Sequence, residues 1–418
     1  MSSHQIQFQH GMSIPEFLSY FGTEAQCAEA LKRSRWPQGF RCPQCSSTQH
    51  YLVVQGARKL YQCGGCRLQT SLTAGTLMEH TKLPLTTWFL AIHLISQAKT
   101  GISALALKRD LGVSYPTAWL LHHKINSAMS RQEAARLLGG AVQLDDAYLG
   151  GERPGGKPGR GSENKVPFVA AVSTNDAGQP IRLKLDMVSG FTSDAIAKWA
   201  KASLLPKAIV TSDGLGCFAA VTEAGCIHLP RVVGALKPRD LPEFKWINTV
   251  LGNLKTMMSG AFKALKYRKY AQTYLGAFAY RFNHRFDLRD LIANLIVDAA
   301  RTKPVPKKVI RDRHAEARFQ SGLSKLPVPV RLLRVQPAGQ AGAGELEDVQ
   351  GLIAKRLDAR PGTAYLLRPD QHVAARWRRV DMAAVRTALQ RALGHTPQAQ
   401  VADATPAATP AETSAAAP

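Results

Sequence analysis

Four of the seven cysteines are spaced as the ligands of a metal ion. They form two C-x2-C pairs, which are Cys42 with Cys45 and Cys63 with Cys66. Seventeen residues separate the pairs, and stretches 50–54 and 59–63 have the pattern of strands that would bring both turns together. Four thiolates then close a tetrahedral Zn²⁺ site, so the spacing predicts a structural zinc ribbon rather than a redox dithiol. The ribbon could hold the fold, touch DNA or bind a partner.

Two aspartates stand where a hard metal cation could bind. Residues 142–149 alternate like a half-buried strand, which places Asp145 and Asp146 on opposite faces. We therefore expect only one of them at a given site. A second, apolar strand begins at Lys207 and delivers Asp213 at its carboxyl end, into a glycine turn.

The elements between these aspartates predict the fold. After a Gly- and Lys/Arg-rich hairpin over 150–165, strands are expected over 165–173 and 181–189, and a helix over 193–204. Three strands, a helix and a fourth strand make the order of a ribonuclease-H-like mixed sheet, whose first and fourth strands pair at the centre. Asp145 and Asp213 would then lie side by side. Two carboxylates within about 4–5 Å repel unless a hard cation sits between them, which implies Mg²⁺ or Mn²⁺.

A third ligand is sought on the helix expected over 243–265. Asn248 and Lys255 lie two helical turns apart, on the same face. An asparagine can offer a carbonyl oxygen to Mg²⁺ but brings no charge, and the plainer interpretation is that Asn248 caps a helix. Glu243, Asn253 and Asp146 are the alternatives for the third oxygen.

Residues 86–129 contain three stretches of helical periodicity. The second, Ser103–Leu111, starts at a serine N-cap and ends before Gly112, and Ser114 can cap the third with Pro116 in its first turn. A helix, a turn with glycine and a second helix are typical of helix-turn-helix proteins, although a helical linker is the alternative. The third stretch has side chains that we expect to face a DNA groove or phosphates: Tyr115, Thr117, His122, His123 and Lys124.

The charge of the chain points to a polyanionic partner. There are 54 Lys+Arg against 30 Asp+Glu, a net charge of +24, so DNA is the first expectation and an anionic membrane surface the second. The absence of any run of 18 apolar residues argues against a membrane span. Segment 231–311 holds 17 Lys+Arg against five Asp+Glu. Within it, Arg281 and Arg285 are expected to contact phosphates, the alternative being a solvated basic face.

The chain is expected to be a multidomain α/β protein. The expected parts are 1–78 (N-terminal helix and ribbon), 79–135 (helix-turn-helix-like), 138–302 (ribonuclease-H-like), 303–393 (C-terminal extension) and 394–418. Residues 345–393 are expected to form a small α-rich unit. The Ala/Pro/Thr-rich end, 394–418, cannot bury a core and is expected to be disordered.

Six stretches resemble bacterial insertion-sequence transposases of the DDE superfamily, in the group with an N-terminal zinc ribbon. They occur in family order between about residues 20 and 290: RWPQGFRCPQC, CGGC with the following TAGTLMEHTKLPLTTWFLAI, LDDAYLGGERPGG, TSDGLGCFAAV, NTVLGNLKTMMSG and YLGAFAYRFNHRF. The resemblance implies that Asp145 and Asp213 are the catalytic aspartates, with Asp146 a neighbouring acidic position. Asn248 falls where most DDE enzymes have glutamate, and Lys255 matches a lysine that follows it.

The resemblance also implies an activity. The chain would be a DNA transposase that binds terminal inverted repeats, cleaves the ends by Mg²⁺-dependent hydrolysis and joins the 3′-hydroxyl ends to target DNA. It would act as a homo-oligomer on DNA, in the cytoplasm and nucleoid of a bacterium. Two alternatives are an inactive or domesticated transposase that is only a zinc-containing DNA-binding protein, and a ribonuclease-H-like nuclease without strand transfer.

Overall fold

A computed structural model describes residues 10–56, 58–150, 165–232, 241–262 and 267–307, residue 310, and short pieces between 326 and 392. It divides into two units, Met1–Arg311 and Asp312–Pro418, which are treated separately below. Most of the expected hairpin over 150–165 and the whole expected tail over 394–418 lie outside the described residues. None of the described helices is long and apolar enough to cross a bilayer.

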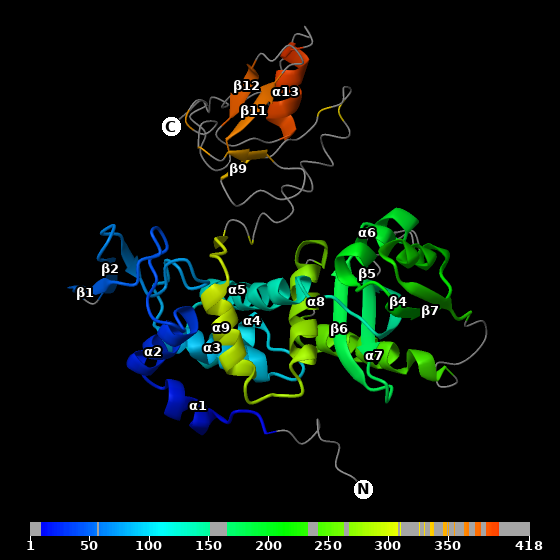
Figure 1. The fold of residues 1–418 in the computed structure, drawn as a ribbon, viewed down its shortest axis with the longest axis horizontal. Helices are drawn as coiled ribbons and strands as arrows, with labels where there is room; N and C mark the ends of the chain where they lie inside the picture. The colour runs from blue at the N-terminus through cyan, green and yellow to red at the C-terminus, as the bar shows by residue number, and fades with distance from the viewer. Residues whose placement is uncertain are drawn as a thin grey trace, which may run out of the picture. The chain divides into compact units, whose positions relative to one another are not determined.

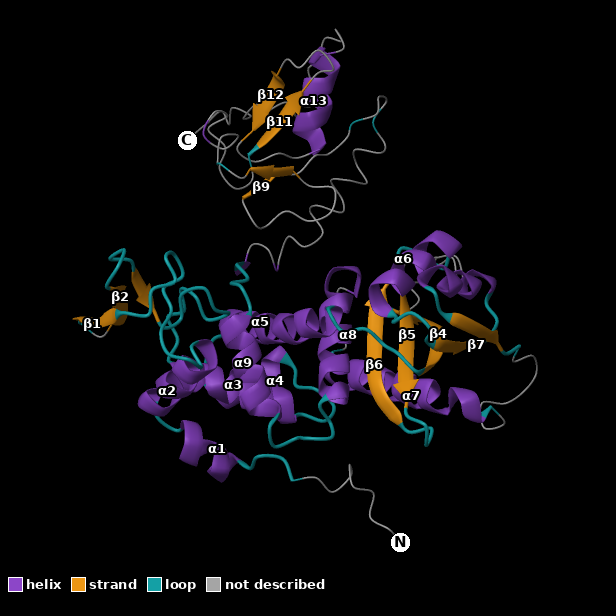
Figure 2. Ribbon diagram, viewed as in Figure 1, coloured by secondary structure: helices purple, strands orange, loops and turns teal. Residues whose placement is uncertain are grey.

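The first unit contains a five-stranded mixed sheet. Its strands are β4 (Ala141–Leu149), β5 (Val166–Thr174), β6 (Pro180–Met187), β7 (Ile209–Ser212) and β8 (Ile227–Pro230). The order is β6-β5-β4-β7-β8, with β5 antiparallel to both β4 and β6, and with β4, β7 and β8 parallel (Figures 1 and 2). The predicted ribonuclease-H-like order, with the first and fourth strands paired, is confirmed. The edge strand β8 was not predicted.

Each face of this sheet has its own core. Helix α6 (Ser193–Ser203) and the 3-10 helix η1 (Gly216–Ala224) pack over one face, where Leu144 and Val210 are buried. Helices α7 (Lys245–Ala261) and α8 (Tyr267–Asn283) cover the other, where Phe168 is buried (Figure 1). Alternate residues of β4 therefore point toward α6 or toward α7.

The first unit has a separate helical core, built from helices at the beginning and at the end of its sequence. It is built by α1 (Ile14–Phe21), α2 (Glu24–Arg35), α3 (Leu85–Gln97), α4 (Ala104–Leu111), α5 (Tyr115–Ala134), α8 and α9 (Leu291–Arg301). Ile125 of α5 and Leu295 of α9 are both fully buried in it. Helix α8 also contributes to the sheet's core, so the expected parts 79–135 and 138–302 share side-chain packing. Helices α8 and α9 are separate, because the chain turns between Asn283 and Leu291.

The helix-turn-helix elements form where the sequence places them. Ser103 caps α4 by accepting the backbone N–H of Ala106 at 3.1 Å, and Gly112 ends it with φ 64°, a conformation that favours glycine. Ser114 is the N-cap residue of α5, although its hydroxyl bonds the Thr117 hydroxyl instead of a backbone N–H.

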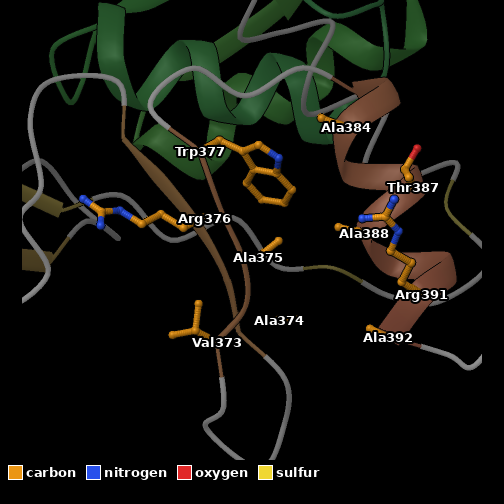
Figure 3. A pocket seen from close by; sticks show the side chains of 10 residues that line it. All are labelled: Val373, Ala374, Ala375, Arg376, Trp377, Ala384, Thr387, Ala388, Arg391 and Ala392. Atoms are coloured by element: carbon orange, nitrogen blue, oxygen red, sulfur yellow. The ribbon is translucent and has the colours of Figure 1, made fainter.

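The described residues of the second unit contain strands as well as a helix, whereas the sequence predicted an α-rich unit over 345–393. The described residues form two short parallel strands, β9 (Val335–Pro337) and β10 (Leu346–Asp348), and a hairpin of β11 (Ala364–Leu367) and β12 (Val373–Trp377), beside helix α13 (Met382–Ala392). A hollow between β12 and α13 is lined largely by alanines (Figure 3). The Trp377 indole faces this hollow and Arg376 points away from it (Figure 3).

Candidate active site and zinc centre

The four paired cysteines converge on one point. Strands β1 (His50–Gln55), β2 (Arg58–Cys63) and β3 (Gln69–Ser71) form an antiparallel sheet, and its β1–β2 hairpin brings the two turns together. One sulfur from each cysteine lies within 4.8 Å of all the others, and the Cys42–Cys66 and Cys45–Cys63 sulfurs are 3.5 Å apart. Tetrahedral zinc with bonds of about 2.3 Å needs sulfurs about 3.8 Å apart, so the donor set fits the ion.

The two cysteine turns have the same backbone geometry. The residue after each pair, Ser46 or Arg67, has a positive φ of 61° or 63°. Its N–H donates to the carbonyl of the first cysteine of its pair, Cys42 or Cys63, at 2.9 Å or 3.1 Å. The backbone N–H of Cys66 lowers the pKa of the Cys63 thiol to about 6, which favours the thiolate that a metal needs.

The ribbon has a small aromatic core of its own and is linked to the end of helix α2 by Trp36 and Arg35. Phe40 stacks on Tyr61 with ring centroids 5.6 Å apart, and Trp36 meets the Tyr61 ring edge-on at 4.8 Å. Arg35, at the end of α2, donates to the carbonyls of Ser71 and Leu72 at 2.7 Å each. A closed four-cysteine centre with this packing suits a structural role, since no position is left open for chemistry.

Asp145 and Asp213 each come directly after one of two residues that are aligned on the paired strands β4 and β7. The register aligns Leu144 of β4 with Ser212 of β7, and the next residue on each strand is the aspartate. Oxygens of Asp145, Asp146 and Asp213 all lie within 4.8 Å of one another. The prediction that Asp145 and Asp213 meet is confirmed by this geometry.

The prediction that only one member of the Asp145–Asp146 pair reaches the site is wrong. The β4–β7 pairing ends at Leu144 and Ser212, so on that side of β4 both side chains have Asp213 as their neighbour, while β5 stays paired on the other side. The Asp145 carboxylate also bends back to accept the backbone N–H of Asp146 at 2.8 Å. Strand alternation describes the starting directions of side chains, not where their ends meet.

A tight turn fixes Asp213. Its Oδ1 accepts the N–H of Leu215 at 3.1 Å, and Gly214 between them has φ 84°. The buried Ser212 hydroxyl lies 2.9 Å from Nε2 of His228 on β8, and it accepts the Gly214 N–H at 3.4 Å. The glycine of the predicted turn is therefore required by its backbone conformation.

Asn248 and Lys255 are both exposed on one face of α7, seven residues apart. The N-cap of this helix is Phe244, so the interpretation of Asn248 as a cap is wrong. Glu243 forms an ion pair with Arg231, Oε1 to Nε at 2.9 Å. Asn253 lies about 140° around the helix from Asn248. Of the residues on or just before this helix, Asn248 remains our predicted ligand.

Two family models match the chain in its two characteristic regions. Residues 137–283 match the ISXO2-like transposase domain, and residues 22–69 match the transposase zinc-ribbon domain. The two matched regions contain the aspartate cluster and the four-cysteine cluster, respectively. It is also 29% identical over 133 residues to an uncharacterized protein in transposable element ISH50 of Halobacterium salinarum. That match covers 31% of this chain and 43% of the relative.

The histidines and the lysine of helix α5 that were expected to face DNA are instead part of the protein interior. His122 and His123 are 2% and 3% exposed and pack against the rings of Tyr270 and Tyr274. The Lys124 ammonium donates to the carbonyl of Leu77 at 3.2 Å. For the two histidines the expectation fails because aromatic rings of α8, about 150 residues away in the sequence, cover them.

The two arginines predicted to contact phosphates are also used inside the protein. Arg285 donates to the carbonyls of Ile181, Phe282 and Pro180, and it lies over the Phe282 ring at 3.8 Å. Arg281 donates to the Met257 sulfur at 2.9 Å, and burial lowers its pKa to about 10. These contacts correct the assignment of both side chains to DNA.

The sequence analysis did not identify Gln143 or His228. Gln143 lies on the same face of β4 as Asp145, because the two are separated by one residue. That period of two is the signal that could have drawn attention to it. His228 carries no comparable local signal, since its contact with the Ser212 hydroxyl depends on strand β8, which was not predicted.

Proposed function

We propose that this chain is a DNA transposase that cleaves the ends of an insertion sequence by metal-dependent hydrolysis and joins them to target DNA. The observation that carries the proposal is the convergence of Asp145, Asp146 and Asp213, whose oxygens lie within 4.8 Å, at the centre of a ribonuclease-H-like sheet. The matches to transposase domains support the same reaction class.

The donor set fits a divalent cation. Three carboxylates so close together repel one another, and a hard cation with oxygen ligands removes this repulsion. Asp145 and Asp213 would hold Mg²⁺ or Mn²⁺, with Asn248 adding a neutral oxygen and Asp146 standing beside them. Cations bound there would lower the pKa of water and stabilise charge on the leaving oxygen.

The remaining chemistry falls to this chain's own side chains and to the DNA. Through a cation held between them, the aspartates would orient the scissile phosphate, and Lys255 would hold a neighbouring phosphate from the face of α7 that it shares with Asn248. Water attacks phosphorus, the P–O3′ bond breaks and a 3′-hydroxyl is freed. That hydroxyl then attacks a phosphate of target DNA and displaces its 3′ oxygen. No bond between protein and DNA is needed at either step.

DNA binding is attributed to the net charge of +24 and to exposed basic side chains near the helix-turn-helix elements, such as Lys108 and Arg109 on α4. The ribbon and helices α4 and α5 would hold the terminal repeats. Two element ends must be joined together, so the chain is expected to act as a homo-oligomer on DNA, in the bacterial nucleoid.

An end-cleavage assay tests the proposal. The DNA carries the inverted repeats that flank the gene, and the product is a strand with a free 3′-hydroxyl. Wild type should cleave with Mg²⁺, whereas Asp145→Asn should bind the DNA normally and leave it intact. If wild type binds the repeats but cleaves with neither Mg²⁺ nor Mn²⁺, the chain is a DNA-binding protein and the enzymatic proposal is wrong. Cleavage without joining would indicate a nuclease.

A further inference from the structure

Helix α7 begins without a cap of its own. A helix leaves its first backbone N–H groups unpaired, and a side-chain oxygen at the N-cap normally accepts one of them. Here the N-cap residue is Phe244, whose side chain cannot accept a hydrogen bond. The acceptor comes instead from β4, far away in the sequence. Oε1 of Gln143 accepts the N–H of Trp246 at 3.1 Å and that of Ile247 at 3.0 Å.

This contact joins the two elements that carry the proposed metal ligands. Gln143 precedes Asp145 by two residues and shares its face of β4, whereas Asn248 directly follows Ile247. A second contact at the same helix end has the Trp246 indole N–H donating to the carbonyl of Gly178, in the turn between β5 and β6. The start of α7 is thereby fixed to the sheet at two points.

We infer that Gln143 is a positioning residue for the proposed reaction: its carboxamide sets the start of α7 against β4 and so places Asn248 and Lys255 over the aspartates. The inference rests on the proposed function. Gln143 touches no substrate in this account and acts only through α7. Displacement of a ligand by about 1 Å can reduce a rate by about 10²-fold, so a single capping oxygen is sufficient to matter.

The chemistry of the contact suggests informative substitutions. Both partners are backbone N–H donors, so only the oxygen of the carboxamide takes part. Gln143→Glu keeps an acceptor of the same reach and adds a negative charge that a helix N-terminus favours. Gln143→Leu has a similar size but no acceptor. Gln26 provides a matched control because its Oε1 caps α2 by accepting the Thr23 N–H at 3.0 Å, away from β4 and α7.

The kinetic experiment measures single-turnover cleavage of terminal DNA at saturating Mg²⁺, together with DNA affinity. Gln143→Leu should cleave about 10²-fold more slowly with unchanged DNA affinity. Gln143→Glu should recover most of the rate, and Gln26→Leu should lower the melting temperature without changing the rate. In an Asn248→Ala background, Gln143→Leu should cause little further loss. A normal rate in Gln143→Leu, or no recovery in Gln143→Glu, would overturn the inference.

Two further readouts do not depend on cleavage. Hydrogen exchange at the Trp246 and Ile247 amides should accelerate in Gln143→Leu and stay slow in Gln143→Glu, and calorimetry should show weaker Mn²⁺ binding to Gln143→Leu. If wild type cleaves no DNA but both changes appear, the proposed function fails and the positioning role stands. Unchanged exchange or unchanged Mn²⁺ binding in Gln143→Leu refutes the positioning role whether or not wild type is active.

Discussion

Leu144 of β4 is aligned with Ser212 of β7, and each is followed by an aspartate. This parallel register explains how two carboxylates 68 residues apart in the sequence come together at the middle of one sheet. Asp146 joins them because the pairing of β4 with β7 ends at Leu144, before either aspartate of β4. The structure thus supplies three carboxylates, where strand alternation predicted two.

The identity of the third metal ligand gives the first prediction. Asn248→Ala should reduce cleavage by orders of magnitude and leave DNA binding and melting temperature nearly unchanged, because Asn248 is exposed and caps nothing. Asn253→Ala, on another face of the same helix, is the control and should cleave normally. If Asn248→Ala is fully active and Asp146→Asn is inactive, the third oxygen belongs to Asp146.

The zinc centre gives the second prediction. Cys63→Ser should release the metal and unfold the N-terminal region, since the binding energy of a structural zinc is also folding energy. Cys217→Ser should retain zinc, because Cys217 lies on η1 and is not part of the four-cysteine cluster. Elemental analysis and circular dichroism provide the measurement. Wild-type protein purified without zinc would contradict the assignment.

Arg285 gives the third prediction, which concerns stability. Arg285→Ala should lower the free energy of unfolding by about 2 kcal/mol, because the guanidinium links the end of α8 to the start of β6 through charged hydrogen bonds. Arg289→Ala is the control, since that side chain is 65% exposed and its ion pair with Glu16 lies at the surface. Chemical denaturation measures both. Equal stability of the two variants would show that the Arg285 contacts contribute little.

The buried His122 gives the fourth prediction, a pH dependence. Burial lowers the pKa of His122 to about 4, whereas an unfolded histidine titrates near 6.5. The unfolded state therefore binds more protons in this window, and the stability contributed by the neutral ring is present above pH 6.5 and is lost as the pH falls toward 4. The lost stability is on the order of 3 kcal/mol by pH 4.

Urea denaturation between pH 4 and 7 tests this titration by comparing wild type with His122→Gln. The difference in unfolding free energy between the two proteins should shrink as the pH falls, because only wild type carries the buried imidazole. A difference that stays constant across the range would mean that His122 does not titrate in the window inferred from its burial.

Local sequence patterns predicted those elements of the fold that are determined by residues close together in the sequence. Alternating residues marked β4, an apolar run ending in Asp-Gly marked β7, and the paired cysteines marked the ribbon. Gly112 and Ser103 likewise gave the bounds of α4 because each performs a local backbone task.

The assignments that failed depend on packing between distant segments. His123 has the spacing of an accessible helical residue, but Tyr270 of α8 covers it, with ring centroids 4.5 Å apart. Arg285 lies in a basic stretch, but carbonyls of β6 occupy its donors. The capping of α7 by Gln143 is non-local in the same way, across 103 residues. Charge and periodicity alone do not reveal which faces a later helix will cover.

The central claim is that Asp145 and Asp213 bind the cation used in cleavage, and metal specificity tests it most directly. In Asp213→Cys a thiolate replaces a carboxylate oxygen, and Mg²⁺ binds thiolates poorly whereas softer Mn²⁺ tolerates them better. End cleavage by this variant should be lost with Mg²⁺ and recover with Mn²⁺, while Asp213→Ala should fail with both ions. Cleavage by Asp213→Cys at the wild-type rate with Mg²⁺, or recovery of Asp213→Ala with Mn²⁺, would contradict the assignment of Asp213 as a metal ligand.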